Sequence, residues 1–276
     1  MGEVHDNAAQ HRLRANMLPA MLLLLFANDS RIQSAGRPAA VFEHIRADQK
    51  PALDKFATFN AEARRLGTAE DLFRFLAWDK SGWPDKKLFQ PLYEAEIKAK
   101  LPLYAGAPPR DMIKKVAKEG AAALPEEERK RLGLDTPLPA VSQEGLLDDL
   151  EKSHCGLMPK KAFGNLAYAQ RYRDAALADA VLKATEKDGS AILFAGNGHV
   201  RADRGAPWYI RERDPKKTIV TVMLLEVEDG KAKPEDYDLK GDDGKPIADF
   251  VVFTPRAERP DPCEDMRKMF EKKKSG

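Results

Sequence analysis

The 276-residue sequence lacks several features that would assign it to a specialised class of protein. Its 46 basic and 44 acidic residues nearly cancel, so it carries no electrostatic footprint for nucleic acid. The apolar stretch within residues 12–27 is too short to span a bilayer comfortably, and we interpret it as the first helix of the fold rather than a signal peptide. With 43% hydrophobic and 33% charged residues, the composition is typical of a globular protein.

Cysteine is scarce, because the chain has only Cys155 and Cys263, and their wide spacing resembles no zinc framework. A disulfide between them is possible in an oxidising compartment, but sequence alone does not establish that they are close. Cys155 beside His154 can also be interpreted as a nucleophile pair. Neighbours in a chain seldom face each other, which argues against that interpretation.

The order of apolar and amphipathic segments predicts strands alternating with helices. We expect helices at residues 8–27, 48–66, 69–77, 90–99 and 163–186, strands at 39–43, 101–105, 191–195, 217–228 and 249–254, and a charged terminal helix from residue 266. This alternation predicts an α/β fold with a mostly parallel sheet flanked by helices. The charge-rich residues 111–160 read as a small helical insertion, which divides the sheet domain into residues 1–110 and 161–276.

Histidines and glutamates follow three of the strand-like segments. Two strings read Gly-x-x-His, at residues 2–5 and 196–199, and Glu43-His44 ends a short apolar run. The carboxyl ends of parallel strands meet at one edge of a sheet, where ligands bind. The side chains expected to converge in a pocket there are Glu3, His5, Glu43, His44 and His199, with Asp174 placed to orient one histidine through its ring N–H.

This cluster has more than one chemical interpretation. Glu3, His5, Glu43 and His199 are suitable ligands for a divalent metal, which would make the protein a metal-dependent hydrolase. However, neither a His-Glu-x-x-His helix nor a Gly-x-Ser-x-Gly elbow is present. Alternatively, the histidines only hydrogen-bond the surrounding loops.

A set of short strings in order along the chain resembles one known family. They are GEVHDN from residue 2, VFEH at 41–44, SGWP at 81–84, HCG at 154–156, QRYRDA at 170–175, GNGHVRADRGAPW at 196–208 and VVFTPRAERPDPC at 251–263. Together they resemble the ChaN-like haem-binding uptake proteins, relatives of the Tiki/TraB and erythromycin-esterase group. The resemblance implies haem held across a homodimer, with a tyrosine of one subunit on the iron and a histidine and a lysine of the other on the propionates. It also implies a bacterial uptake lipoprotein in the periplasm or at the outer membrane, with an outer-membrane haem receptor as a possible partner.

Carried onto this sequence, the resemblance suggests Tyr93 and Tyr104 as candidate iron ligands and His199 with Arg201 as candidate propionate partners. The alternatives are ordinary core packing for Tyr93 and a pair of Arg201 with Asp203 within the loop. Relatives often have Tyr-x-Pro after the Trp-Pro motif, whereas this chain has Phe89 at that tyrosine's place. The expected strand before Glu3 is also short, since only Met1 and Gly2 precede it, so we expect either a late assigned start or a lost strand. These two departures predict weak or substoichiometric haem binding.

Overall fold

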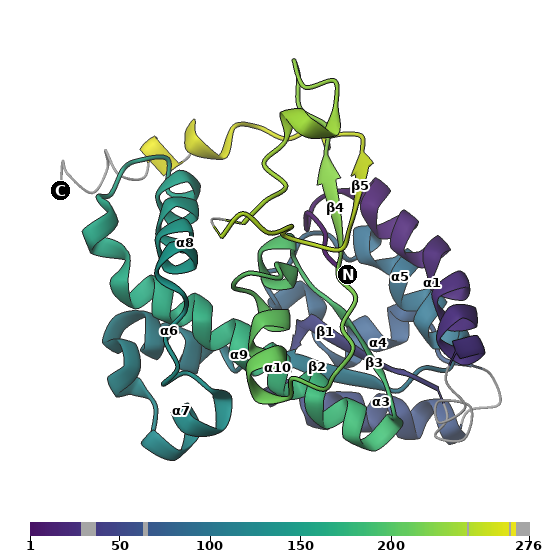
Figure 1. The fold of residues 1–276 in the computed structure, drawn as a ribbon. Coiled ribbons are helices and arrows are strands. Elements are labelled where there is room, and N and C mark those ends of the chain that lie inside the picture. Colours follow the sequence, from purple (N-terminus) through teal and green to yellow (C-terminus); the bar gives the residue numbers. More distant parts are fainter. Residues whose placement is uncertain (29–36, 63–65, 242, 265, 269–276) are drawn as a thin grey trace.

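The computed structural model describes residues 1–28, 37–62, 66–241, 243–264 and 266–268 (Figure 1). Its strands are β1 (Ala39–Arg46), β2 (Leu103–Ala107), β3 (Ala191–Phe194), β4 (Val222–Glu226) and β5 (Phe250–Thr254). Its α-helices are α1 (Ala8–Asn28), α3 (Lys50–Glu62), α4 (Ala69–Phe75), α5 (Lys86–Lys98), α6 (Arg110–Glu119), α7 (Glu126–Leu132), α8 (Ala140–Ser153), α9 (Gly164–Asp188) and α10 (Ala206–Arg213). The expected α/β fold with a parallel sheet is confirmed.

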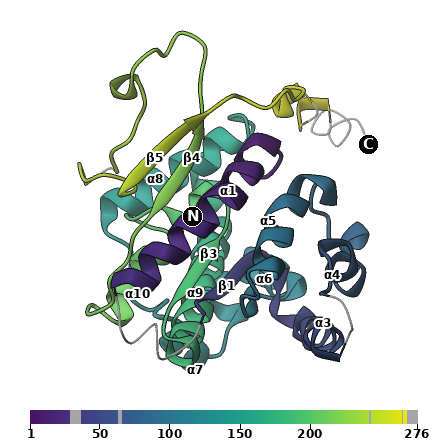
Figure 2. The same ribbon diagram turned by 90° about the vertical axis from the view of Figure 1, so that its right-hand side faces the viewer.

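All three strand pairings are parallel. One sheet has the order β2-β1-β3, and β4 pairs with β5 in a second. The extended N-terminal residues lie between β3 and β4 and join the two sheets (Figure 2). The bridging bonds run from Met1 N to Leu193 O, from Gly2 N to Val222 O and from Asn197 N to Glu3 O. The first residues of the chain therefore occupy the place of a central strand, and this places Glu3 and His5 at the carboxyl edge.

Strand β1 shows why the sheet is covered on both faces. Its side chains alternate, as they must in a strand. Ala40 and Phe42 join the core formed with α1, α3, α4 and α5, whereas Ala39 and Val41 pack against α9. Seven of its eight residues are buried, as expected for a central parallel strand.

Two of the differences between the observed elements and the sequence expectations have a clear physical reason. Strand β4 starts at Val222, later than expected, because the backbone N–H and hydroxyl of Thr221 both donate to the Asp249 carboxylate. Helix α10 was not expected. Its short span carries no clear apolar stripe, and Pro207 stands in its first turn, a position that proline tolerates.

Residues 111–160 contain most of α6 and all of α7 and α8, which stand to one side of the sheet in Figure 1. Helix α6 packs against α9, which connects this helical region to the sheet. The division into two domains stays a prediction. The expected terminal helix from residue 266 lies mostly outside the described residues. Among the described helices, none is both long and apolar enough to cross a membrane.

Candidate functional site

The carboxyl edge of the sheet brings together the five side chains expected there. Glu43 and His44 come from β1, His199 follows β3, and the N-terminal segment supplies Glu3 and His5. All except His5 are almost fully buried. The cluster has two halves, each organised around one carboxylate, which we call the Glu3 half and the Glu43 half.

In the Glu3 half, a single carboxylate contacts three imidazoles and one guanidinium. Its Oε1 accepts from His5 Nδ1 at 2.9 Å and from His44 Nε2 at 2.8 Å. Its Oε2 is ion-paired with Arg14 and lies 3.1 Å from His11 Nδ1. A buried carboxylate requires such compensation, because removing its charge from water is costly.

The hydrogen bonds in this half fit neutral imidazoles. His11 Nε2 donates to the His5 carbonyl at 2.9 Å, and its Nδ1 accepts from Arg14 Nη2 at 2.9 Å. Burial lowers the pKa of His11 to about 4 and lowers the pKa of His44 well below its ordinary value. Burial also lowers the pKa of His5, although Glu43 opposes the shift.

His5 differs from the other imidazoles because 35% of its side chain is exposed. Its Nδ1–H is held by Glu3, which leaves the lone pair on Nε2. Within the described part of the chain, Nε2 makes no hydrogen bond, and its carboxylate neighbour, Glu43 Oε2, is 3.9 Å away. A carboxylate that orients an imidazole through one nitrogen, leaving the other open, is the arrangement that histidine ligands of metals use.

In the Glu43 half, by contrast, the carboxylate oxygens and both histidine nitrogens already have partners within the chain, so we call this half closed. Glu43 Oε1 accepts from Arg173 Nη2 at 2.6 Å and from His199 Nε2 at 3.1 Å, and its Oε2 accepts from the Gly196 backbone N–H at 2.7 Å. The other ring nitrogen of His199, Nδ1, lies 2.5 Å from Asp174 Oδ1. Both nitrogens of His199 are therefore occupied within the chain.

The charges in this half determine its protonation. Burial disfavours the His199 imidazolium, but Glu43 and Asp174 outweigh it and raise the pKa of His199 to about 9. Burial also favours a neutral Glu43, yet His199 and Arg173 hold its pKa well below the ordinary value. At neutral pH the half contains a charged imidazole fixed between carboxylates.

An aromatic ring and a glycine shape the surroundings of His5. The half-buried Trp83 ring packs edge-on against it at 4.8 Å between centroids, and Trp83 Nε1 donates to the His44 carbonyl at 3.0 Å. Gly196 lies beneath the imidazole, where a Cβ would be 2.9 Å from both Cε1 and Nε2 of His5. Arg173, 29% exposed, is the cation on this side of the rim.

The other residues suggested for haem contact lie elsewhere. Tyr93 is fully buried behind the cluster, where its ring stacks on Phe42. The Tyr104 hydroxyl donates to Asp188 at 2.6 Å, at the last residue of α9. Arg201 pairs with Asp203 at 2.7 Å rather than extending beside His199. The structure therefore brings neither tyrosine hydroxyl to the rim, and it leaves no free pair of His199 and Arg201 for one carboxylate.

Phe89 is likewise a core residue. It is fully buried, and its ring packs against His11 at 4.3 Å and against His44 at 4.8 Å. Phe89 and Tyr93 are four residues apart on α5, so they share one face of that helix. That face covers the Glu3 half from the core side.

The metal interpretation has partial geometric support. Among the described residues, Glu3, His5 and His44 offer ligand atoms within 4.8 Å of one another. However, the Glu3 oxygen already accepts from both imidazoles, and the Arg14 guanidinium pairs with the same carboxylate. A divalent cation would face that positive charge, so the donor set does not favour a metal-dependent hydrolase.

A separate apolar groove of about 540 Å³ lies away from this cluster. Its walls come from α3, the end of α5 and the start of β2. None of its lining residues is a histidine or a carboxylate. The ionisable chemistry and the apolar groove are therefore in different places, and we assign the candidate site to the rim.

Three site residues were absent from the sequence predictions. His11 and Arg14 sit three apart on α1 and face the Glu3 carboxylate together, a spacing that could have been noticed. Arg173 precedes the predicted Asp174 in the sequence, but no contact with Glu43 was expected. Arg173 and Asp174 are neighbours on a helix, so their side chains point in different directions. Both nevertheless extend to the rim, because their partners Glu43 and His199 lie side by side.

Fold and site together define a parallel α/β protein with a buried histidine–carboxylate cluster at the carboxyl edge of its sheet. Residues 1–210 match the family described as "Haem-binding uptake, Tiki superfamily, ChaN", and the chain belongs to this family. Among solved structures it is similar to ChaN of Campylobacter jejuni, described with cofacial haem binding. The identity is 20%, the TM-score 0.62, and the match covers 84% of this chain and 81% of that one.

Two further structural matches are too weak to support an inference about this chain. One is a succinoglycan biosynthesis protein, at 14% identity and a TM-score of 0.30, covering 69% of this chain and 58% of that one. The other is a Bacillus cereus protein, at 14% identity and a TM-score of 0.29, covering 71% and 60%. No curated protein matches the sequence.

Proposed function

We propose that this protein binds haem at the rim, with His5 Nε2 as the axial ligand of the iron. The observation that carries the proposal is the open imidazole of His5, fixed by Glu3 through its other nitrogen and 35% exposed. Neutral imidazole is a competent axial ligand of haem iron. The lowered pKa of His5 keeps this ligand neutral at physiological pH.

Two neighbours of His5 suit the rest of the ligand. Trp83 offers an aromatic surface beside the imidazole, which matches an apolar porphyrin. Arg173 is partly exposed on the same rim, and a guanidinium pairs well with a propionate carboxylate. Bound haem would contribute an iron centre, whose oxidation state and reactivity depend on the axial ligand.

The proposed cellular setting is a bacterial haem or iron uptake system. The Campylobacter relative is described with cofacial haem binding, and two facing haems suit a site shared by two copies of the chain. We therefore propose a homodimer with haem at its interface, and an outer-membrane receptor as the source of haem. The disulfide between Cys155 and Cys263 supports an oxidising compartment such as the periplasm, where a lipoprotein at the outer membrane would lie.

The test is a haemin titration of the purified protein and of His5→Ala, followed by the Soret band. The wild type should bind with the spectrum of an imidazole complex, and His5→Ala should weaken binding by at least about tenfold, as the loss of a metal-supporting contact does. His154→Ala removes a half-buried imidazole that contacts Leu150 and Phe163 rather than the rim, and is the matched control. Tight binding that survives His5→Ala but is lost in Tyr104→Phe would show that the ligand is misplaced.

A further inference from the structure

The last described segment of the chain crosses the molecule in the open. After β5, residues 255–264 leave the sheet and extend to the helical region that contains α8, shown in yellow in Figure 1. We call this segment the strap. None of its residues is buried, and it pairs with no strand. Two anchors hold it in place, one at each end.

The first anchor lies directly beside the candidate site. Arg259 donates two bonds to the carboxylate of Asp6, at 2.7 and 2.8 Å, and two to the carboxylate of Glu226, at 2.6 and 2.7 Å. Asn7 adds a bond from its side-chain amide to the Pro255 carbonyl at 2.9 Å. Asp6 follows His5 in sequence, so this anchor ties the strap to the segment that carries the open imidazole.

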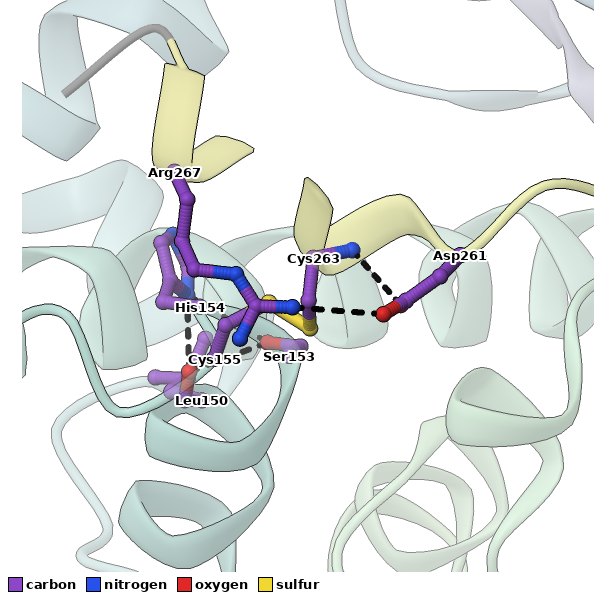
Figure 3. Close-up of a disulfide and its surroundings, with 7 residues drawn as sticks. All are labelled: Leu150, Ser153, His154, Cys155, Asp261, Cys263 and Arg267. Atoms are coloured by element: carbon purple, nitrogen blue, oxygen red, sulfur yellow. Dashed lines mark hydrogen bonds and ion pairs between the residues drawn. A yellow bond between two sulfur atoms is a disulfide. The ribbon is translucent and has the colours of Figure 1, made fainter. Parts of the chain in front are cut away.

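The second anchor is the disulfide between Cys263 and Cys155, which directly follows the final turn of α8 (Figure 3). The Cys263 backbone N–H donates to Asp261 Oδ1 at 2.9 Å, which fixes the chain just before the bond. Besides the disulfide, the described residues at this end form the exposed ion pair of Arg267 with Asp261 at 3.3 Å, which lies within the C-terminal segment itself. Exposed pairs of this kind contribute little.

The stretch between the anchors is stiff. Pro260 and Pro262 fix two backbone angles within the few residues that separate Arg259 from Cys263. A short, proline-restricted segment transmits the position of one end to the other. The covalent link at α8 therefore restrains Arg259, and Arg259 in turn restrains the residues next to His5.

We propose that the strap is a redox-controlled latch on the rim, closed while the Cys155–Cys263 disulfide is intact and loosened when a thiol reductant cleaves it. In the closed state the strap restrains the segment that carries His5 and slows exchange of the rim's ligand. Cleavage consumes one dithiol: its thiolate attacks one sulfur, the S–S bond breaks, and a second thiolate resolves the mixed disulfide. The dithiol becomes a disulfide, and its two protons and two electrons appear on the thiols of Cys155 and Cys263.

The first experiment needs no haem, so it is independent of the proposed function. Haem-free protein is treated with diethyl pyrocarbonate, which acylates neutral accessible imidazoles, before and after reduction by a trialkylphosphine, and modification is assigned by mass spectrometry. We expect the rate at His5 to rise severalfold after reduction and equally in a Cys155→Ser, Cys263→Ser double variant. Arg259→Ala should raise it with the disulfide intact, whereas Arg267→Ala, which removes a pair at the outer end, should leave it unchanged.

The buried histidines report on folding in the same experiment. A selective increase at His5, with His11 and His44 protected, supports the latch. An unchanged rate at His5 overturns it, and a joint increase at all three imidazoles shows global unfolding and overturns it as well.

A second arm, which rests on the proposed haem function, measures stopped-flow haemin capture by the oxidised and reduced forms. Faster capture and faster release in the reduced form are expected. If His5 becomes accessible on reduction but neither form binds haemin, the latch stands and the haem proposal fails. If haemin binds and both rates are independent of the disulfide, the latch fails and the haem proposal stands.

Discussion

The two halves of the rim use the same kinds of residue and reach opposite results. In the Glu3 half, one carboxylate is matched by Arg14, which leaves no net negative charge to hold a proton on His5, His11 or His44. In the Glu43 half, two carboxylates face one arginine, and His199 supplies the missing positive charge. Burial therefore keeps the imidazoles of the Glu3 half neutral, because no unbalanced charge opposes it, whereas the charges of the Glu43 half make His199 a charged structural link.

The largest effect should come from removing the carboxylate of the closed half. Glu43→Ala would leave the positive charges of His199 and Arg173 without their partner carboxylate. It would also leave the Gly196 N–H without a hydrogen-bond acceptor. Breaking a buried charge pair in this way costs about 3–5 kcal/mol. Chemical denaturation should show a loss of that size for Glu43→Ala and a smaller one for Glu43→Gln, which keeps an acceptor. A loss below about 1 kcal/mol for the alanine variant would contradict the closed network.

A second effect should appear in the dependence of stability on pH. The free energy of unfolding should fall by about 2–3 kcal/mol on the acid limb of the profile and by a similar amount on the alkaline limb. The pKa of His11 is lowered to about 4 in the fold, so on acidification the unfolded chain takes up this proton before the folded protein does. The free energy of unfolding therefore decreases as the pH falls from 6.5 to 4. The pKa of His199 is raised to about 9, so its contribution is complete below pH 6.5 and is lost as pH rises through 9.

Single variants should separate these two limbs. His11→Gln should shrink the acid limb, where His44 also contributes, and His199→Gln should remove the alkaline one. The measurement is the free energy of unfolding across pH for the wild type and both variants. If either variant changed both limbs equally, the acid and alkaline limbs would not report on separate halves of the cluster.

The smallest effect concerns Gly196, which lies where the halves meet. A Cβ there would press on Cε1 and Nε2 of His5 at 2.9 Å, so Gly196→Ala should displace the imidazole at a cost of about 1–2 kcal/mol. Haemin affinity should fall with it, because the displaced ring is the proposed ligand. Gly198→Ala is the matched control, since a Cβ at Gly198 meets nothing within 4 Å. Equal effects of both substitutions would show that the loop, rather than the contact with His5, is responsible.

The convergence of the rim could be anticipated because its residues stand directly after apolar strands. Glu43 and His44 follow the apolar first half of β1, His199 follows β3, and parallel strands end at one edge. The roles within the rim could not be anticipated in the same way. Whether a histidine is charged depends on which arginine lies beside its carboxylate, and Arg14 and Arg173 come from helices whose rotation the local pattern does not determine.

Other residues show a similar division. Core packing of Tyr93 could be anticipated from the sequence, and Tyr93 indeed shares one buried face of α5 with Phe89 one turn before it. The pairing of Cys155 with Cys263 could not be inferred, because only the path of the strap brings two distant positions together. Sequence periodicity thus indicates faces and edges, whereas contacts between distant segments depend on the assembled fold.

The N-terminal segment between β3 and β4 has a consequence for how the chain folds. Met1 N and Leu193 O hydrogen-bond across a separation of 192 residues, and Gly2 pairs with Val222 farther still along the chain. Contacts of such long range require a costly loop closure and slow the folding reaction. During synthesis, residues 1–3 are made long before β3 and β4, and they must wait for these strands before they acquire partners. The completed sheet, and with it the position of His5, therefore forms late in folding.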